Sequence, residues 1–397
     1  MSSIFAGAIR SAGLAIFVCA LGIPAAGAQG TARSMDIGLS IRAAALGGAS
    51  NALFWGDELD HWANPALLGY AHALQYEHGR TRLVPGLAAN VVLTSDVITL
   101  GGGGLGVVMS GKPIGQVKLD YGPSVATDDQ GNPIGTFDSY ETVKTNGFGV
   151  SALAALDAAL GLGGRVAHLS RYADISYGMN FKDVVVALAP QSPGGTGSTS
   201  ARDWGYMVRL TPIDGISGGG RLPLRFDAAY GHSVLSYNDD ATITFLNENY
   251  PARVSIHHRD GYAFHMAFDP PAIRESAHGL WGDLVAGLTP LISVGWTIDH
   301  AKIGPSSSFP GGYPTESHGI EVALAHVVAY RTGHYRDRDG EIDGDTSGWS
   351  FGLPIGRWGG GYFETATWPQ AQNSGLRDVH RQAFALWVDP LAIWRSR

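Results

Sequence analysis

The sequence predicts an all-β protein: an antiparallel transmembrane β-barrel of about 14 strands, within a range of roughly 12 to 16, with an N-terminal segment that plugs the lumen. Three observations lead to this fold class. Extended segments alternate bulky apolar residues with small or charged ones, glycine supplies 56 of the 397 residues, and charged residues make up only 16%. After residue 28, no stretch of about 18 apolar residues occurs that would form a transmembrane helix. In lipid, a closed barrel is the remaining structure that satisfies every backbone N–H and C=O.

The alternation indicates which face of each strand meets lipid. In residues 203–210 every second position is bulky, and residues 224–231, 262–269 and 292–299 repeat the pattern. The positions between them hold small residues mixed with Asp, Arg and His. Because neighbouring side chains of a strand point to opposite faces, the bulky face fits lipid and the other face fits a crowded, wet lumen. A secreted β-sandwich or a soluble barrel is the alternative fold.

Four local features qualify this pattern. Asp96-Val97 and residues 156–158 are predicted to be short turns between strands. His326 falls among the bulky positions of residues 320–330, which indicates a bulge or a strand top outside the lipid. Residues 101–104 are consecutive glycines, which favours a strand that a neighbouring backbone or a plug approaches closely.

The N-terminus is predicted to direct export. Residues 1–28 have the pattern of a secretory signal peptide, with Arg10 before an apolar stretch and small residues at 26–28. A single membrane anchor is the alternative, although about a dozen apolar residues fall short of the ~20 that span a bilayer. The one cysteine, Cys19, lies in this segment, so no disulfide is expected in the mature protein. The predicted organisation is a signal peptide over 1–28, a hatch or plug segment over 29–71 and a barrel over 72–397, in the outer membrane of a Gram-negative-type bacterium.

Composition and charge exclude several classes of protein. The formal net charge of −8 and the pI near 5.9 argue against nucleic acid as a partner. A hydrophobic content of 45% excludes a wholly disordered chain. These values leave outer-membrane lipid as the expected surroundings and give no indication of the oligomeric state.

Two short motifs lie between the predicted signal peptide and the first strand. The first is Leu46-Gly47-Gly48-Ala49, and the second is Asn64-Pro65-Ala66. Together, over residues 40–69, they resemble the N-terminal signature of FadL-like outer-membrane transporters and their PorV/PorQ relatives; residues 56–58 depart slightly from it. The resemblance implies a 14-stranded barrel whose N-terminal segment folds inward as a hatch. A surface helix and turn that caps the periplasmic end is the alternative.

The resemblance also implies a function. It indicates a channel or transporter for hydrophobic small molecules, fatty acids or hydrocarbons, and Phe54, Trp55 and Trp62 are predicted to contact such a ligand or to pack within the plug. The alternative is a PorV/PorQ-like component of type IX protein secretion that binds cargo proteins. A second alternative is an outer-membrane lipid-modifying enzyme, but no Ser–His spacing singles out a catalytic pair, so no enzyme and no catalytic residue is predicted.

An acidic stretch offers the one candidate metal site. Asp337, Asp339, Asp343 and Asp345 lie at near-alternate positions with two glycines among them. Calcium prefers several hard oxygen ligands from a flexible loop, although the spacing matches no EF-hand. A solvated acidic loop is the simpler interpretation. The 14 histidines are expected at lumen or loop positions, and no other cofactor is predicted.

Overall fold

The computed structural model describes residues 32–390, except for residues 57, 89, 128–129, 163–167, 191–194, 217–222, 238–241, 246–247, 252–255, 270–281, 283–286, 305–312, 339, 357 and 373. The predicted signal peptide lies outside the described residues. The strands are β1 (Leu74–Arg82), β2 (Val92–Gly102), β3 (Leu105–Ser110), β4 (Val117–Thr127), β5 (Pro133–Ser151), β6 (Ala173–Ala187), β7 (Thr196–Asp214), β8 (Leu224–Tyr237), β9 (Thr242–Phe245), β10 (Glu248–Pro251), β11 (Ile256–Phe268), β12 (Ile292–Gly304), β13 (Tyr313–Leu324), β14 (Val328–Asp337), β15 (Ile342–Ile355), β16 (Gly359–Trp368) and β17 (Val379–Val388). The helical elements are η1 (Arg33–Met35), α2 (Ile41–Ala45), η2 (Pro65–Tyr70), α3 (Ala152–Leu162) and η3 (Leu169–Arg171).

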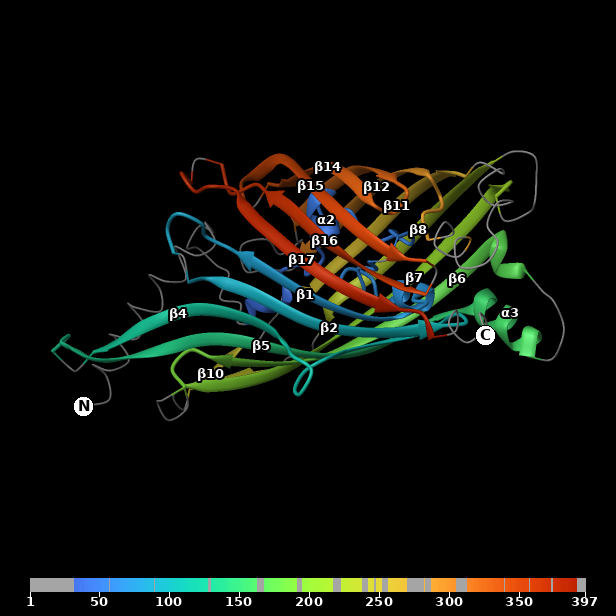
Figure 1. Ribbon diagram of the computed structural model, residues 1–397. Helices are drawn as coiled ribbons and strands as arrows, with labels where there is room; N and C mark the ends of the chain where they lie inside the picture. Colours follow the sequence, from blue (N-terminus) through green and yellow to red (C-terminus); the bar gives the residue numbers. More distant parts are fainter. Residues whose placement is uncertain are drawn as a thin grey trace.

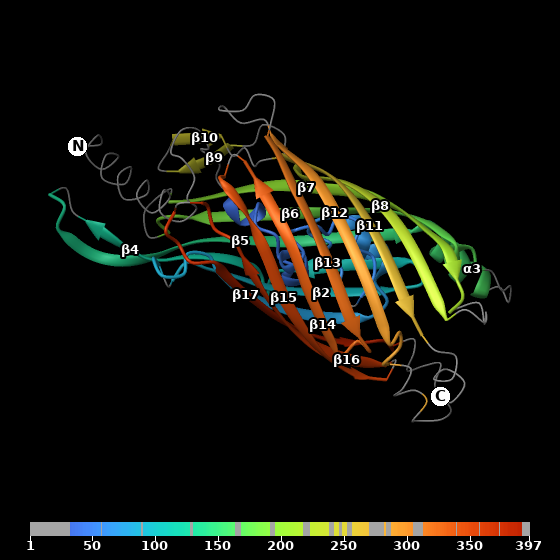
Figure 2. The same ribbon diagram turned by 90° about the horizontal axis from the view of Figure 1, so that it is seen from above.

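The strands close into one antiparallel barrel (Figures 1 and 2). Neighbours in sequence pair with each other, and β1 pairs with β17 to complete the ring. Strands β3 and β4 both lie between β2 and β5, so they occupy one position in the ring. The described barrel therefore has 14 strand positions, as predicted. We call the end at which β1 begins and β17 finishes the β17 end, and the opposite end the loop end.

The predicted alternation is confirmed along the strands. In β11, for example, Tyr262 and Phe264 point outward and are 44% and 36% exposed, whereas Ala263 points inward and is fully buried. The large exposed side chains of the other strands follow the same phase and give the barrel an apolar outer surface. Such a surface is typical of barrels that face lipid. No helix in the described part of the chain is long and apolar enough to cross a membrane.

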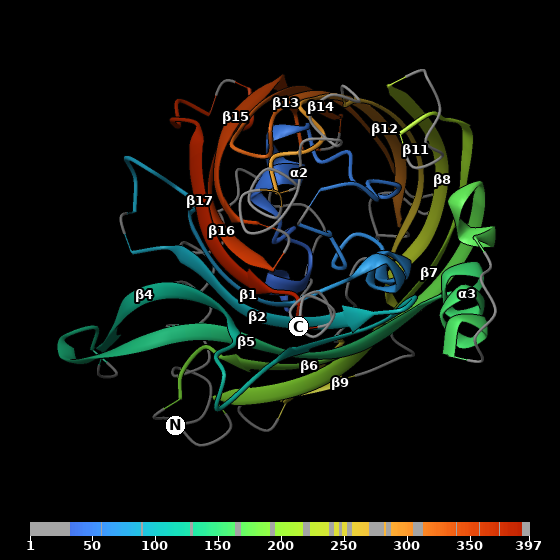
Figure 3. The same ribbon diagram turned by 45° about the vertical axis from the view of Figure 1, so that its right-hand side comes forward.

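Two predicted turns are wrong. Asp96 and Val97 lie inside the continuous strand β2. The strand accommodates the two polar residues there because Ser95 points inward and the Asp96 carboxylate accepts hydrogen bonds from the side chains of Tyr76 and His78 on β1. Residues 156–158 belong to the helix α3, which connects β5 to β6 outside the ring (Figure 3). The run of alanine and leucine in this segment favours a helix over a turn.

The irregularity at His326 is neither a bulge nor a strand top. Strand β13 ends at Leu324, residues 325–327 make a tight turn, and β14 begins at Val328. Ala325 and His326 have φ values of 52° and 53°, which is the left-handed conformation that such a turn requires. The polar residue among apolar ones thus marks a reversal of the chain.

Residues 32–73, which we call the lumenal segment, lie inside the ring of strands (Figure 3). Most of these residues are buried, and α2 packs against β14, β15, β16 and β17. Whether this segment acts as a movable hatch stays a prediction. Its position is explained by the inner surface of the wall.

A row of glycines on the inner wall makes room for the lumenal segment. A Cβ atom added at any of them would lie within 3.0 Å of another atom, and an atom of the lumenal segment is among the close neighbours each time; they are Gly101, Gly106, Gly149, Gly178, Gly205, Gly231, Gly261, Gly295, Gly319, Gly333 and Gly348. They lie on successive strands, and Gly149, Gly178 and Gly205 are directly opposite one another in the register. These glycines therefore serve close packing between wall and segment. Of residues 101–104, Gly101 in β2 has the predicted close approach, whereas Gly103 and Gly104 lie in the turn to β3 beside α3.

A single methyl group should disturb this packing. In Gly178→Ala the new Cβ would lie 2.2 Å from the backbone oxygen of Pro65, so we expect a loss of about 1–3 kcal/mol in the free energy of unfolding. Denaturant unfolding in detergent micelles measures the loss. Gly135→Ala is the matched control, because no atom lies within 4 Å of its added Cβ. Equal midpoints for the two variants would contradict the proposed packing.

Candidate functional site

Arg42 holds the lumenal segment against the wall. It lies at the start of α2, whose N-cap Ser40 accepts a hydrogen bond of 2.9 Å from the Ala43 N–H. The Arg42 guanidinium donates two hydrogen bonds to the Glu321 carboxylate of β13, of 2.8 Å from Nε and 2.7 Å from Nη2. Its Nη1 donates to the backbone oxygens of Trp55 and Glu58. One buried side chain thus joins two parts of the segment to β13.

The Glu321 carboxylate continues into a chain of charges along the inner wall. Arg331 of β14 donates from Nε to Glu321 at 2.5 Å, and its Nη1 lies 2.8 Å from Oε1 of Glu364 on β16. Trp55 Nε1 also donates to Glu321, at 2.9 Å. The charged side chains of these ion pairs are all buried. Removing one of them therefore leaves its partner on the wall as an unpaired charge away from water.

A second anchor fixes the middle of the lumenal segment. The backbone N–H groups of Ser50 and Asn51 both donate to Asp299 Oδ2 of β12, each at 2.9 Å. The Asn51 side chain donates to the Gly231 backbone oxygen at 2.8 Å, and Asn64 Nδ2 donates to the Asn51 backbone oxygen, also at 2.8 Å. The two polar anchors explain why the segment follows the inner wall instead of capping one end.

The predicted motif residues all lie in the lumenal segment. Leu46, Gly47, Gly48 and Ala49 follow α2, and both glycines have positive φ, of 72° and 85°. A Cβ at Gly47 would lie 2.4 Å from the His334 backbone oxygen, so the chain there runs directly against β14. In the second motif, Asn64 caps η2 by accepting a 3.0 Å hydrogen bond from the Ala66 N–H, and Pro65 occupies the first helical position. The motifs therefore shape two close approaches to the wall.

The three predicted ligand contacts lie in different surroundings. Phe54 and Trp55, each 8% exposed, border a cavity inside the barrel, and the Trp55 ring stacks on His265 with centroids 4.9 Å apart. Trp62 is 4% exposed, and the Lys182 ammonium lies 3.5 Å from its ring centroid. Trp62 thus makes a cation–π contact between segment and wall. Contact of any of the three with a ligand stays a prediction.

This cavity, which we call the large cavity, has a volume of about 440 Å³ and lies toward the β17 end. Its lining combines the aromatic pair with charged side chains from segment and wall; those used below are Arg42, Glu58, Arg209, Arg225, Asp227, His265, Arg331 and Glu364. Residues of the connections at the β17 end, among them Pro290 and His326, border it as well. The volume falls within the range of small-molecule sites.

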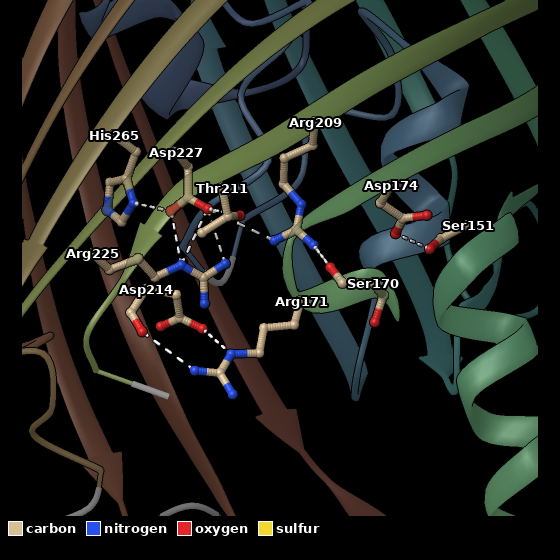
Figure 4. A network of polar contacts seen from close by, with 10 residues as sticks. All are labelled: Ser151, Ser170, Arg171, Asp174, Arg209, Thr211, Asp214, Arg225, Asp227 and His265. Atoms are coloured by element: carbon tan, nitrogen blue, oxygen red, sulfur yellow. Dashed lines mark hydrogen bonds and ion pairs between the residues drawn. The ribbon is translucent and has the colours of Figure 1, made fainter. Parts of the chain in front are cut away.

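The charges at one side of this cavity pair with one another (Figure 4). Asp227 accepts hydrogen bonds from Arg225 Nε at 2.9 Å and from Thr211 Oγ1 at 2.5 Å. Arg209 donates to the Ser170 backbone oxygen and lies 4.0 Å from Asp227. This network joins β7 and β8 to the connection that follows α3, and its charges are largely balanced within the wall.

A buried apolar cluster, which we call the apolar compartment, lies on the opposite side of the lumen. It consists of Ala32, Met35, Leu39, Trp62, Leu68, Val84, Val91, Leu93, Val97, Val108, Val117, Leu119, Val143, Val184, Val186 and Ala201. Half of these residues come from β2 to β6, Ala201 comes from β7, and the rest come from the lumenal segment and the β1–β2 connection. These side chains are buried against one another, so this part of the lumen has an apolar interior.

The wall beside the apolar compartment is interrupted. Strand β2 pairs with β4 at Val92–Thr94 and with β3 at Ile98–Gly102, which leaves residues 95–97 without a partner in either register. Between β3 and β4 the chain leaves the sheet over residues 111–116 and is closed by a Gly111–Gly115 bridge. We call this place the wall break. Val97, Val108 and Val117 of the apolar compartment border it from inside.

A small cavity of about 30 Å³ lies between the apolar compartment and the large cavity. Leu39, Trp62 and Val97 of the apolar compartment line it, together with Glu58 and His72. Glu58 and His72 also line the large cavity. These two side chains of the lumenal segment therefore stand between the apolar compartment and the large cavity.

The predicted acidic stretch is a hairpin between β14 and β15. Asp343 and Asp345 lie 3.1 and 2.9 Å from the ring nitrogens of His334, and Asp337 accepts a hydrogen bond from the Gly340 N–H. Asp339 lies outside the described residues. Within the described part of the chain, no group of three or more His, Cys, Asp or Glu is arranged to hold a metal ion. Calcium binding stays a prediction.

Comparison with known proteins gives matches only among solved structures. No family model and no curated protein matches the chain. The chain is similar to the toluene transporter TodX of Pseudomonas putida, at 10% identity and a TM-score of 0.42 over 89% of this chain and 98% of that one. It is also similar to a Pseudomonas aeruginosa FadL homologue, at 9% identity and a TM-score of 0.39 over 88% of this chain and 98% of that one. The CymD monoaromatic hydrocarbon channel matches at 9% identity and a TM-score of 0.40, over 88% and 96%.

At such identities and TM-scores, no family, ligand or activity is carried over to this chain. The PorV/PorQ resemblance stays a prediction.

Several residues that organise the lumen were not singled out from the sequence. Glu321, Asp299 and Glu364 each lie on the small-residue face of an otherwise apolar strand. That placement is the signal that identifies them, because a charge on the inner face of a barrel needs a partner there. Glu321 and Asp299 have partners on the lumenal segment that are hundreds of residues away in sequence, and Glu364 pairs with Arg331 two strands along the wall, so the pairs become visible only in the fold.

Proposed function

We propose that the protein is an outer-membrane channel for hydrophobic small molecules such as fatty acids or hydrocarbons. The observation that carries the proposal is the apolar compartment inside the barrel, directly beside the wall break. A water-filled pore would be lined by polar side chains throughout. An apolar cluster next to an interruption of the strand pairing instead suits a molecule that moves between lumen and lipid.

The path of such a molecule follows from the arrangement of the lumen. It would occupy the apolar compartment, which it reaches from the loop end or through the wall break. From there, Glu58 and His72 stand before the large cavity and the β17 end. A small shift of the lumenal segment around these two residues would join the compartments, while Arg42 and Asp299 keep the rest of the segment anchored.

Uptake in living cells tests this function. A bacterial strain that lacks the protein is expected to accumulate less labelled long-chain fatty acid or labelled toluene, and a plasmid copy is expected to restore uptake. Unchanged uptake of both compounds would contradict the proposal. If secretion of cargo proteins failed in the same strain, the PorV/PorQ-like alternative would replace it.

A further inference from the structure

The outer face of the barrel changes from apolar to polar at one level on β17, β1 and β2. Toward the β17 end, Leu386 of β17, Leu74 of β1 and Leu100 of β2 point outward and are 60%, 44% and 47% exposed. The next outward positions toward the loop end are polar; they are Gln382 and His380 on β17, His78, Arg80 and Arg82 on β1, and Asp96 and Thr94 on β2. The register aligns the change, because His78 lies opposite both Asp96 and Phe384, after which β17 turns polar. We therefore expect the hydrocarbon of the membrane to end at this level.

The polar side chains that mark this level satisfy one another. The Asp96 carboxylate accepts a hydrogen bond of 2.7 Å from the Tyr76 hydroxyl, and His78 Nδ1 lies 2.9 Å from the same oxygen. Tyrosine is typical of the boundary between hydrocarbon and head groups. The same arrangement recurs on β8 and β11, in Tyr230, His232 and Asp260. These contacts leave no charge of the His78–Asp96 pair for an external partner.

Beyond this level, β1 carries two arginines whose charges no protein group balances. Arg80 and Arg82 both point outward and are exposed. Within the described part of the chain, neither guanidinium forms a hydrogen bond or an ion pair. The register places neutral side chains beside them: Arg80 lies between Gln382 of β17 and Thr94 of β2, and Arg82 lies beside Val92 of β2. The two positive charges are therefore open to the surroundings of the barrel.

The nearby acidic side chains do not cancel these charges. Asp120 of β4 lies opposite Val92, and its Oδ2 accepts a hydrogen bond of 2.6 Å from Lys118 Nζ. Arg377 and Asp378 are adjacent in the connection before β17, so their charges offset each other. The outer face of β17, β1 and β2 thus has an excess of positive charge on a chain whose formal net charge is −8. Such a local excess indicates an anionic partner.

The spacing of the two arginines suits a phosphate group. Residues two apart in a strand lie on the same face with Cα atoms about 7 Å apart. Both guanidinium groups can therefore donate hydrogen bonds to the oxygens of one phosphate, which arginine contacts through its planar fork. The phosphate would lie at the end of the apolar outer face, and acyl chains attached to it would extend over Leu74, Phe384 and Leu386.

We propose that the outer face of β1 and β17 binds a phosphate-bearing membrane lipid, with Arg80 and Arg82 holding the phosphate and the apolar side chains below them contacting the acyl chains. The inference goes beyond the proposed function, since it concerns the outer face of the wall and is independent of what the lumen carries. It assigns these arginines a partner that the rest of the chain does not provide.

Thermal unfolding of the purified full-length protein in dodecyl maltoside micelles tests this site. Three probes are titrated separately: lipid A with both phosphates, lipid A from which the phosphates have been removed, and inorganic phosphate. A ligand that binds the folded protein raises the unfolding temperature in proportion to its affinity and concentration. We expect lipid A with both phosphates to bind at least about tenfold more tightly than the dephosphorylated form, the effect of losing hydrogen bonds to a charged group.

Variants of the two arginines connect the binding to this face. The double variant Arg80→Gln, Arg82→Gln is expected to fold like the wild-type protein and to bind lipid A at least about tenfold more weakly. Arg336→Gln is the matched control: Arg336 is 42% exposed on β14, but its charge is already paired with Asp343, so wild-type binding is expected. Equal affinity for the two forms of lipid A, or unchanged affinity in the folded double variant, would overturn the inference. Equal stabilisation by inorganic phosphate at the same concentration would also overturn it, because free phosphate would then be the ligand.

Discussion

Replacing Arg42 by alanine is expected to release the lumenal segment and to lower the free energy of unfolding by about 3–5 kcal/mol. The substitution removes two hydrogen bonds to Glu321 and leaves this buried carboxylate with Arg331 as its remaining cationic partner. It also frees the backbone oxygens of Trp55 and Glu58, which border the large cavity. Denaturant unfolding and chymotrypsin cleavage within residues 32–73 measure the two effects.

An exposed arginine provides the control for this variant. Arg336 of β14 lies 3.5 Å from Asp343, and both side chains are more than 40% exposed. Because exposed ion pairs contribute about 0–1 kcal/mol, Arg336→Ala is expected to unfold at nearly the wild-type denaturant concentration. Arg42→Lys should fall between the two, since lysine keeps the charge but cannot form the two-pronged contact. If Arg42→Ala were as mild as Arg336→Ala, the anchoring role of Arg42 would be refuted.

Deleting residues 112–116 is expected to close the wall and to reduce uptake of a hydrophobic compound to the level of cells without the protein. The register explains the choice of deletion. Met109 pairs with Ile98, and Lys118 pairs with Thr94. After removal of the five residues, Met109 and Lys118 are separated by as many residues as Ile98 and Thr94, so both pairs fit one continuous register. The same deletion also makes the register with β5 continuous. β3 and β4 would then form one unbroken strand.

Stability and uptake together distinguish the outcomes of this deletion. The closed barrel gains backbone hydrogen bonds at residues 95–97, so its resistance to denaturant is expected to equal or exceed that of the wild-type protein. A variant that keeps the length but replaces Pro113 and Ile114 with glycine should retain uptake. Full uptake by a folded deletion variant would show that the wall break is not on the path.

The sequence predicted the barrel because its signal is local. Alternation in segments such as residues 262–269 reports directly which face meets lipid, and the positions of Tyr262 and Phe264 confirm it. The turns were harder to predict. A polar residue such as Asp96 is typical of a turn, and only the fold shows that its carboxylate accepts hydrogen bonds from Tyr76 and His78 on the neighbouring strand. The helix α3 was missed because a short apolar run is compatible with either strand or helix.

The candidate site depends on contacts between distant residues and was predicted only in part. The motifs at Leu46 and Asn64 identified the segment that lies in the lumen, and Phe54 and Trp55 were expected near a ligand. Glu58 was noted only as a departure from the family pattern, since nothing local shows that its carboxyl group is buried. The wall break was also invisible, because residues 111–116 read as an ordinary connection between two strands.

Labelling at two adjacent residues of β12 tests most directly the claim on which this account depends, that the apolar face of the barrel meets lipid and the other face lines the lumen. Ser293 lines the large cavity, whereas Val294 is the next residue and points to the outer face. Single cysteines are practical here, since the one native cysteine, Cys19, lies in the predicted signal peptide. In protein reconstituted in lipid vesicles, Ser293→Cys is expected to react with a water-soluble thiol reagent, and a fluorophore on Val294→Cys to be quenched by brominated lipid. The opposite result, a quenched label at 293 and a water-accessible thiol at 294, would contradict the assignment of inside and outside.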